Sequence, residues 1–123
     1  MFELKIATDF AAAHQLKMVA KKCESLHGHN WKIEVCVEGE KLNEAGVLMD
    51  FGDLKRAVAK IIEKLDHKYL NDLGYFYNNI PPSSENIALY VANELKNLIT
   101  EPGVRISRVT AWESQDSCAT YSF

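Results

Sequence analysis

Hydrophobic and polar residues alternate along two stretches near the start of the chain, with the period of two that is typical of half-buried β-strands. In residues 2–8 the apolar side chains occupy even positions, and this strand can continue to His14. The period returns in residues 27–37, where His27 and His29 share the parity of the apolar residues. On a regular strand, both histidines therefore project from the apolar face.

Two later stretches have apolar residues three and four positions apart, a spacing that predicts amphipathic helices. The first helix begins after Asp50, a favourable N-cap residue, and runs to about Leu65. Two prolines at 81–82 then block helix formation until Ser83 or Ser84 caps the second helix.

The remaining segments complete a ββααββ order. Residues 15–26 and the polar residues 66–79 are interpreted as connections, while residues 104–113 and 119–123 have the composition and alternation of strands. Strands on either side of paired helices predict an α+β fold, a four-stranded antiparallel sheet with two helices on one face. No repeat or long linker divides residues 1–123, so we expect a single domain.

Composition narrows the class of protein further. With 123 residues and a formal charge of −3, the chain has no overall basic field to recruit nucleic acid. It contains no apolar run long enough to span a membrane, and its start lacks the pattern of a signal peptide. Its three cysteines form no C-x-x-C pair, which favours a reducing, cytoplasmic location over a disulfide framework or a zinc ribbon.

Three of the four histidines can meet at one point. His27 and His29 are one residue apart on a predicted strand, and His14 closes the strand expected to pair with it. Three imidazoles would bind Zn²⁺ and leave a fourth position open, as catalytic zinc sites do. The alternative is a pair of histidines near a turn with ordinary hydrogen bonds.

Cys23 lies just before this histidine pair and has two interpretations. It is either a fourth ligand that closes a structural zinc site or a base whose pKa is lowered beside the metal. The second interpretation needs a histidine supported by a carboxylate, which Asp66 and His67 can supply. Taken alone, the Asp66–His67 pair is more often found at the end of a helix, where histidine suits the dipole.

Six segments appear in order along nearly the whole chain: FAAAH at 10–14, CESLHGHN at 23–30, MDFGDLK at 49–55, LDHKYLN at 65–71, PSSEN at 82–86 and WES at 112–114. Together they resemble the 6-pyruvoyltetrahydropterin synthase/6-carboxytetrahydropterin synthase family. The resemblance implies the tunnelling fold, in which three subunits close a barrel and two barrels stack into a homohexamer. The charge and hydropathy of the chain, for their part, give no reason to expect a nucleic-acid or membrane partner.

The resemblance also implies the residues of the active site. Its Zn²⁺ ligands correspond to His14, His27 and His29. Its catalytic group corresponds to Cys23, Asp66 and His67, of which the last two would come from a neighbouring subunit.

In the family, a glutamate matching Glu113 anchors the pterin ring, whose amino group and adjacent N–H form a bidentate donor pair. Ser83, Ser84 and Glu85 match the supporting pterin contacts, with serine where the family often has threonine. Without the resemblance, Glu113 would be read as a solvated charge at a strand end, and the serines as helix caps only.

The implied reaction is a lyase reaction on 7,8-dihydroneopterin triphosphate. Zinc polarises the side-chain oxygens, the Cys23 thiolate moves a side-chain proton, His67 exchanges protons with the hydroxyls, and triphosphate is eliminated. Lys17, Lys21 and Lys22 could contact the triphosphate, although a solvated basic loop is the simpler interpretation.

The spacing after Cys23 favours one product. The short Cys-x-x-x-His-Gly-His resembles enzymes that form 6-carboxy-5,6,7,8-tetrahydropterin for queuosine and deazapurine synthesis, whereas 6-pyruvoyl enzymes typically have a longer gap. Another branch has a glutamate three residues before the first histidine and forms 6-hydroxymethyl-7,8-dihydropterin for folate synthesis. Glu24 occupies that position, so dual activity is possible; the alternative is a loop charge without a role.

A hypothesis of another class is a non-catalytic, zinc-binding oligomer in which Cys23 closes a four-ligand site. The presence of Asp66, His67 and Glu113 argues against it, because structural zinc requires none of them.

Overall fold

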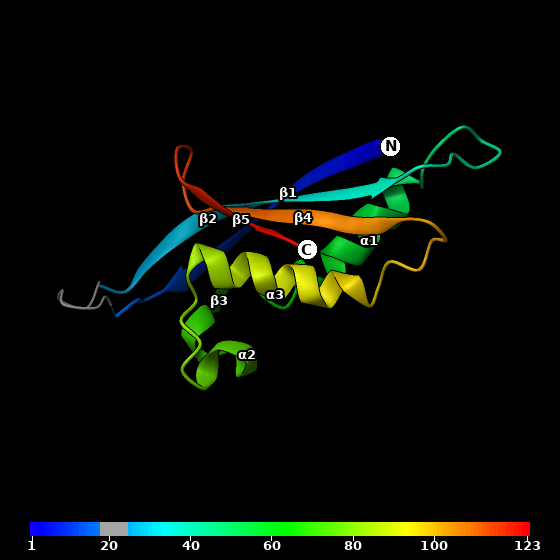
Figure 1. The fold of residues 1–123 in the computed structure, drawn as a ribbon. Coiled ribbons are helices and arrows are strands. Elements are labelled where there is room, and N and C mark those ends of the chain that lie inside the picture. Colours follow the sequence, from blue (N-terminus) through cyan, green and yellow to red (C-terminus); the bar gives the residue numbers. More distant parts are fainter. Residues whose placement is uncertain (18–24) are drawn as a thin grey trace.

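The computed structural model describes residues 1–17 and 25–123. Their strands form one sheet in the order β3-β1-β2-β4-β5 (Figure 1). The strands are β1 Phe2–His14, β2 His27–Gly39, β3 Lys68–Tyr69, β4 Arg105–Trp112 and β5 Cys118–Ser122. The four long strands pair with one another in antiparallel fashion, and their places in the chain agree with the sequence prediction.

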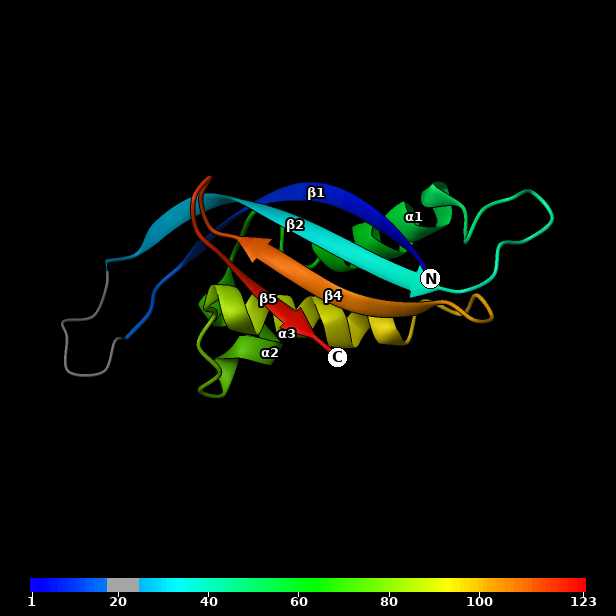
Figure 2. The same cartoon turned by 45° about the horizontal axis from the view of Figure 1, so that its top comes forward.

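Two long helices, α1 (Phe51–Ile62) and α3 (Ser84–Lys96), lie on the same side of the sheet (Figures 1 and 2). The Asp50 carboxylate accepts a hydrogen bond from the backbone N–H of Gly52, which confirms the predicted N-cap of α1. Ser83, rather than Ser84, caps α3 by accepting from the N–H of Asn86 at 3.2 Å. No helix in the described ranges has the length and apolar character needed to cross a bilayer.

The sheet differs from the prediction because it has five strands rather than four. The additional strand, β3, contains only two residues and runs parallel to β1, pairing Ala12 with Lys68 and Ala13 with Tyr69. Two residues cannot show an alternating pattern, so sequence periodicity could not reveal this strand. The same connection also contains a short 3-10 helix, η1 (Leu70–Asp72), and the short helix α2 (Gly74–Tyr77).

Helix α1 ends three residues before the predicted boundary at Leu65. Leu65 is nevertheless buried, so its apolar character reflects packing beyond the end of the helix. The chain turns here and brings the N–H of His67 to the carbonyl of Ala11, at 2.6 Å. This early turn carries residues 66–71 alongside β1.

The core lies between the apolar face of the sheet and the two long helices. Its fully buried residues from β2, α1 and α3 include Trp31, Ile33, Val35, Val37, Leu54, Val58, Ile61, Ile87, Val91 and Leu95. His14, at the end of β1, is the one fully buried polar residue among those described. An imidazole in this position requires partners, since an unbonded polar group is costly to bury.

Candidate metal centre and active site

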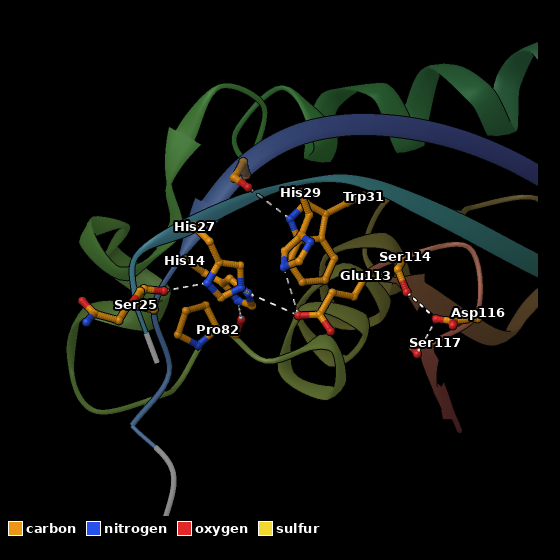
Figure 3. A network of polar contacts seen from close by, with 12 residues as sticks. His14, Ser25, His27, His29, Trp31, Pro82, Glu113, Ser114, Asp116 and Ser117 are labelled. Carbon is orange, nitrogen blue, oxygen red and sulfur yellow. Dashed lines mark hydrogen bonds and ion pairs between the residues drawn. The ribbon is translucent and has the colours of Figure 1, made fainter. Parts of the chain in front are cut away.

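Strand pairing brings the three predicted histidines together. In the β1–β2 register, His14 lies opposite His27 and Ala12 lies opposite His29. His27 and His29 are two positions apart on β2, so their side chains project from the same face of the sheet. The Nε2 atoms of His14 and His27 are 3.0 Å apart, and the three rings face one another (Figure 3).

Glu113 joins the histidines from the residue directly after β4. One of its carboxylate oxygens, Oε1, lies 3.3 Å from Nε2 of His14 and 3.2 Å from Nε2 of His29. Each of the four residues offers one ligand atom, and these atoms all lie within 4.8 Å of one another. The resemblance associates Glu113 with the pterin ring, whereas the geometry also makes its carboxylate a candidate metal ligand.

Backbone carbonyls hold two of the imidazoles in a suitable orientation. Nδ1 of His14 donates to the carbonyl of Pro82 at 2.8 Å, and Nδ1 of His27 donates to the carbonyl of Ser25 at 2.6 Å. Because a carbonyl can only accept, Nδ1 carries a proton in both rings, and in the neutral form of each ring Nε2 has the lone pair that a metal needs. Histidines that bind metals commonly have such a partner at their other nitrogen.

The donor set fits a zinc ion. Ligand atoms about 2.0 Å from a tetrahedral zinc are separated from one another by roughly 3.3 Å. Three separations are close to this value: 3.0 Å between Nε2 of His14 and Nε2 of His27, and 3.3 and 3.2 Å from Glu113 Oε1 to Nε2 of His14 and His29. All four ligand atoms lie within 4.8 Å of one another. Three imidazole nitrogens with a carboxylate oxygen also match the ligand types that zinc prefers.

Trp31 forms the floor of the site on the core side. Its ring packs edge-on against His14 and His29, with centroids 5.1 and 5.3 Å away. Its indole N–H donates to the carbonyl of Ala12 at 3.3 Å, which ties the ring to the neighbouring strand. The histidines therefore stand on a rigid apolar surface, and such a surface limits the access of water to a metal.

Asp66 and His67 form a hydrogen-bonded pair outside the metal group. One oxygen of Asp66 accepts from Nδ1 of His67 at 2.9 Å and from the backbone N–H of Ala11 at 3.0 Å. The Ala11 N–H, and then the His67 ring, lower the pKa of Asp66. This arrangement leaves Nε2 of His67 available for proton exchange.

His67 occupies an unusual and open position. Its φ is 58°, in the left-handed region, and its side chain is 81% exposed. Together with Lys68 and His29 it lines a shallow surface hollow over the small residues of β1 and β2. Within the described part of one chain, His67 does not belong to the metal group.

The remaining predicted residues fall into two groups. Ser83 and Ser84 are partly buried at the start of α3, and Glu85 is exposed in its first turn. Ser83 follows Pro82, so the cap of α3 and the His14 hydrogen bond adjoin each other. Cys23 and Glu24, together with Lys21 and Lys22, lie outside the described residues, and Lys17 is exposed.

Sequence reasoning missed the carbonyls of Pro82 and Ser25, because backbone acceptors leave no side-chain signal. It also missed the closeness of Glu113 to the histidines. A signal for this closeness existed, since Glu113 follows a predicted strand at the end where the neighbouring strand begins with His27 and His29. The sequence pattern did not predict that β2 and β4 are neighbours in the sheet.

Comparison with known proteins identifies the family. A family model described as 6-pyruvoyl tetrahydropterin synthase matches residues 3–122. The chain belongs to this family. It is an enzyme similar to the 6-carboxytetrahydropterin synthases: it is 42% identical over 114 residues to a putative 6-carboxy-5,6,7,8-tetrahydropterin synthase from Archaeoglobus fulgidus, covering 93% of this chain and 90% of that protein.

Two further relatives of this 6-pyruvoyl tetrahydropterin synthase family member bear on its function and fold. A dihydroneopterin monophosphate aldolase from Pyrococcus furiosus is 40% identical over 109 residues, covering 87% of this chain and 85% of that protein. The solved structure of 6-pyruvoyl tetrahydropterin synthase from Caenorhabditis elegans aligns with a TM-score of 0.87 at 27% identity, covering 99% and 95% of the two chains.

Proposed function

We propose that this family member is a zinc-dependent lyase that converts 7,8-dihydroneopterin triphosphate to 6-carboxy-5,6,7,8-tetrahydropterin. The observation that carries the proposal is the convergence of His14, His27 and His29 on one point, with Glu113 beside them. The similarity to 6-carboxytetrahydropterin synthases, together with the short spacing between Cys23 and His27, supports this product.

His14, His27 and His29 would hold the zinc through their Nε2 atoms. A zinc ion held there would supply Lewis-acid stabilisation for negative charge on the oxygens of the substrate side chain. The Pro82 and Ser25 carbonyls keep two of the rings in the tautomer that this requires. The orientation of the ligands is therefore set before substrate binds.

Glu113 would anchor the pterin ring by accepting two hydrogen bonds from its amino group and adjacent N–H. Because this carboxylate adjoins the histidines, a ring held by it would have its side chain toward the metal group. Ser83, Ser84 and Glu85 are proposed as supporting contacts at the start of α3. They lie next to Pro82, whose carbonyl reaches His14.

Cys23 and the Asp66–His67 pair would transfer the protons. The Cys23 thiolate removes a proton from the substrate side chain, and His67, oriented by Asp66, exchanges protons with the hydroxyls. The hydrogen bond between Asp66 and Nδ1 of His67 supports this assignment, because it leaves Nε2 facing outward. Triphosphate leaves as the C3′–O bond breaks. Addition of one water and cleavage of the C1′–C2′ bond then give acetaldehyde and the 6-carboxyl group, and the electrons released at C1′ reduce the dihydropterin ring to the tetrahydro level.

We further propose a homohexamer in which His67 serves the site of a neighbouring subunit. Its 81% exposed side chain and its absence from the metal group of its own chain support this role. The sheet also ends in short strands, β3 and β5, whose open edges can pair with another copy. The lack of a disulfide motif and the use of a thiolate favour the reducing cytoplasm.

A second candidate function is the aldol cleavage of a dihydroneopterin phosphate to 6-hydroxymethyl-7,8-dihydropterin. The similarity to the Pyrococcus furiosus aldolase favours it, at an identity nearly equal to that of the first relative. Glu24, three residues before His27, is the proposed base for this cleavage. The two functions share the metal group and differ in which bond of the side chain is broken.

Product analysis tests the proposal. The purified protein is incubated anaerobically, under reducing conditions, with 7,8-dihydroneopterin triphosphate or monophosphate, with and without a strong chelator. We expect mass spectrometry to detect 6-carboxytetrahydropterin and acetaldehyde from the triphosphate, and we expect the chelator to abolish both. Formation of only 6-hydroxymethyl-7,8-dihydropterin would establish the second function, and no turnover by a zinc-loaded oligomer would favour the non-catalytic zinc protein.

A further inference from the structure

The side chain of Asn71 holds the backbone of the residue that follows His14. Its carboxamide oxygen accepts from the N–H of Gln15 at 2.9 Å, and its carboxamide nitrogen donates to the carbonyl of Gln15 at 2.8 Å. Asn71 lies in η1, 56 positions along the chain from Gln15. The side chain of Asn71 therefore bonds both the N–H and the C=O of Gln15.

These bonds continue a ladder that begins at Ala11. Alternate residues of a strand direct their N–H and C=O groups to the same edge, so Ala11, Ala13 and Gln15 form one series. Ala11 is bonded by the Asp66 carboxylate and the His67 N–H, and Ala13 pairs with Tyr69 in β3.

Beyond β3 the chain continues into η1, which contains Asn71. The carboxamide of Asn71 supplies the donor and the acceptor that a further strand residue would have supplied. His14 lies between Ala13 and Gln15, both of which are held on this edge. On the other edge, His14 pairs with His27.

We propose that Asn71 is a positioning residue for the metal site. Its carboxamide fixes the end of β1, and with it the backbone of His14, to the segment that begins with the Asp66–His67 pair. The proposal rests on the proposed function, in that it takes His14 as a zinc ligand. One segment, residues 66–71, then positions both the proton-transferring pair and a ligand of the metal.

Zinc affinity, measured by competition with a chromogenic chelator, tests the proposal. We expect Asn71→Ala to weaken zinc binding about tenfold, at the low end of the loss seen when the support of a metal ligand is removed. Asn78→Ala, at an exposed asparagine of the same connection, is the control and should bind like wild type.

Asn71→Asp separates a hydrogen-bonding role from a loss of packing. An ionised carboxyl has no donor for the Gln15 carbonyl, whereas a protonated one offers one donor and one acceptor, as the amide does. At pH 7.5 the carboxyl is ionised, well above the ordinary aspartate pKa of about 3.9, so Asn71→Asp keeps the size of the side chain and loses its donor. This variant should therefore bind zinc about as weakly as Asn71→Ala, whereas a wild-type affinity would overturn the hydrogen-bonding role.

Hydrogen exchange in the wild-type protein provides a test that does not depend on the folding of a variant. Coupling is reciprocal, so zinc should slow exchange at the backbone amides of residues 66–71 and leave α1 unchanged. Unchanged exchange at 66–71, or an Asn71→Ala affinity equal to that of Asn78→Ala, would overturn the role of Asn71. Failure of wild type to bind zinc, or zinc binding unaffected by His29→Ala, would instead overturn the proposed metal site on which this role rests.

Discussion

The Nε2 atoms of His14 and His27 lie 3.0 Å apart, although the residues are 13 positions apart in the chain. The pairing of β1 with β2 places these residues opposite each other, and backbone carbonyls hold each Nδ1. Both lone pairs therefore point into the same space. Two neutral imidazoles so arranged repel each other unless a proton or a metal ion lies between them.

Removal of a metal-binding histidine should strongly weaken zinc binding. We expect His29→Ala to weaken zinc affinity by more than about 100-fold, beyond the 10- to 100-fold loss typical for a supporting residue. His67→Ala is the matched control, because this histidine lies outside the metal group. His67→Ala should retain one zinc per chain while losing turnover. Elemental analysis measures the zinc content, and product formation measures the turnover. Loss of zinc from His67→Ala would contradict the assignment of His67 to proton transfer rather than to metal binding.

Glu113→Gln distinguishes a pterin anchor from a zinc ligand. If the carboxylate anchors the ring, zinc content stays at the wild-type level and KM rises roughly 10- to 100-fold, because a hydrogen bond to a charged group contributes about 1.5–3 kcal/mol. If Oε1 is a permanent ligand, zinc affinity falls instead. Zinc content and steady-state kinetics decide between these outcomes, with Glu63→Gln, at an exposed residue after α1, as the control.

The sequence pattern predicted the features that depend on residues close together in the chain, namely the faces of strands and the starts of helices. The period of two placed His27 and His29 on the apolar face, and Asp50 and a serine at 83 or 84 marked the starts of the helices. Burial of the β2 side chains and the observed caps agree with these predictions. Each prediction needed only local chemistry and the geometry of a single element.

What the pattern did not supply depends on contacts between distant segments. Strand β3 exists because residues 68–69 meet β1, and nothing in two residues predicts this meeting. The approach of Glu113 to His14 depends on how two strands are ordered in the sheet, and the Pro82 carbonyl has no side-chain signature. The resemblance to a family gave the candidate site residues, and the structure gives the separations among the four of them that it brings together.

Asp66→Asn should change how stability depends on pH. The native pKa of Asp66 is lowered, first by the Ala11 N–H and then by His67. Its contribution is therefore present above the ordinary aspartate value of about 3.9 and is lost as pH falls through the lower native value.

The variant should accordingly be less stable than wild type at pH 6, and this difference should narrow below about pH 4. Urea unfolding of the metal-free proteins between pH 6 and 3 measures both. A difference that stays constant, or widens toward acid pH, would show that the lowered pKa of Asp66 does not support the fold.

Cys23→Ala should separate catalysis from metal binding. Loss of a general base typically lowers turnover by about 10²- to 10⁴-fold. We expect such a loss in kcat with zinc content unchanged, because three histidines remain to hold the ion. Cys118→Ala, at an exposed cysteine in β5, should behave like wild type. Loss of zinc from Cys23→Ala would indicate that the thiolate closes a structural site.

Glu24→Ala tests whether one metal site supports two reactions. If Glu24 is the base for aldol cleavage and Cys23 the base for formation of the 6-carboxy product, removal of the carboxylate should eliminate 6-hydroxymethyl-7,8-dihydropterin and retain 6-carboxytetrahydropterin. Mass spectrometry measures the ratio of the two products from each phosphate, with Glu44→Ala, at an exposed residue beyond β2, as the control. An identical product ratio in Glu24→Ala and wild type would leave Glu24 as a solvated loop charge, and the choice between products would then have to come from the residues around the pterin.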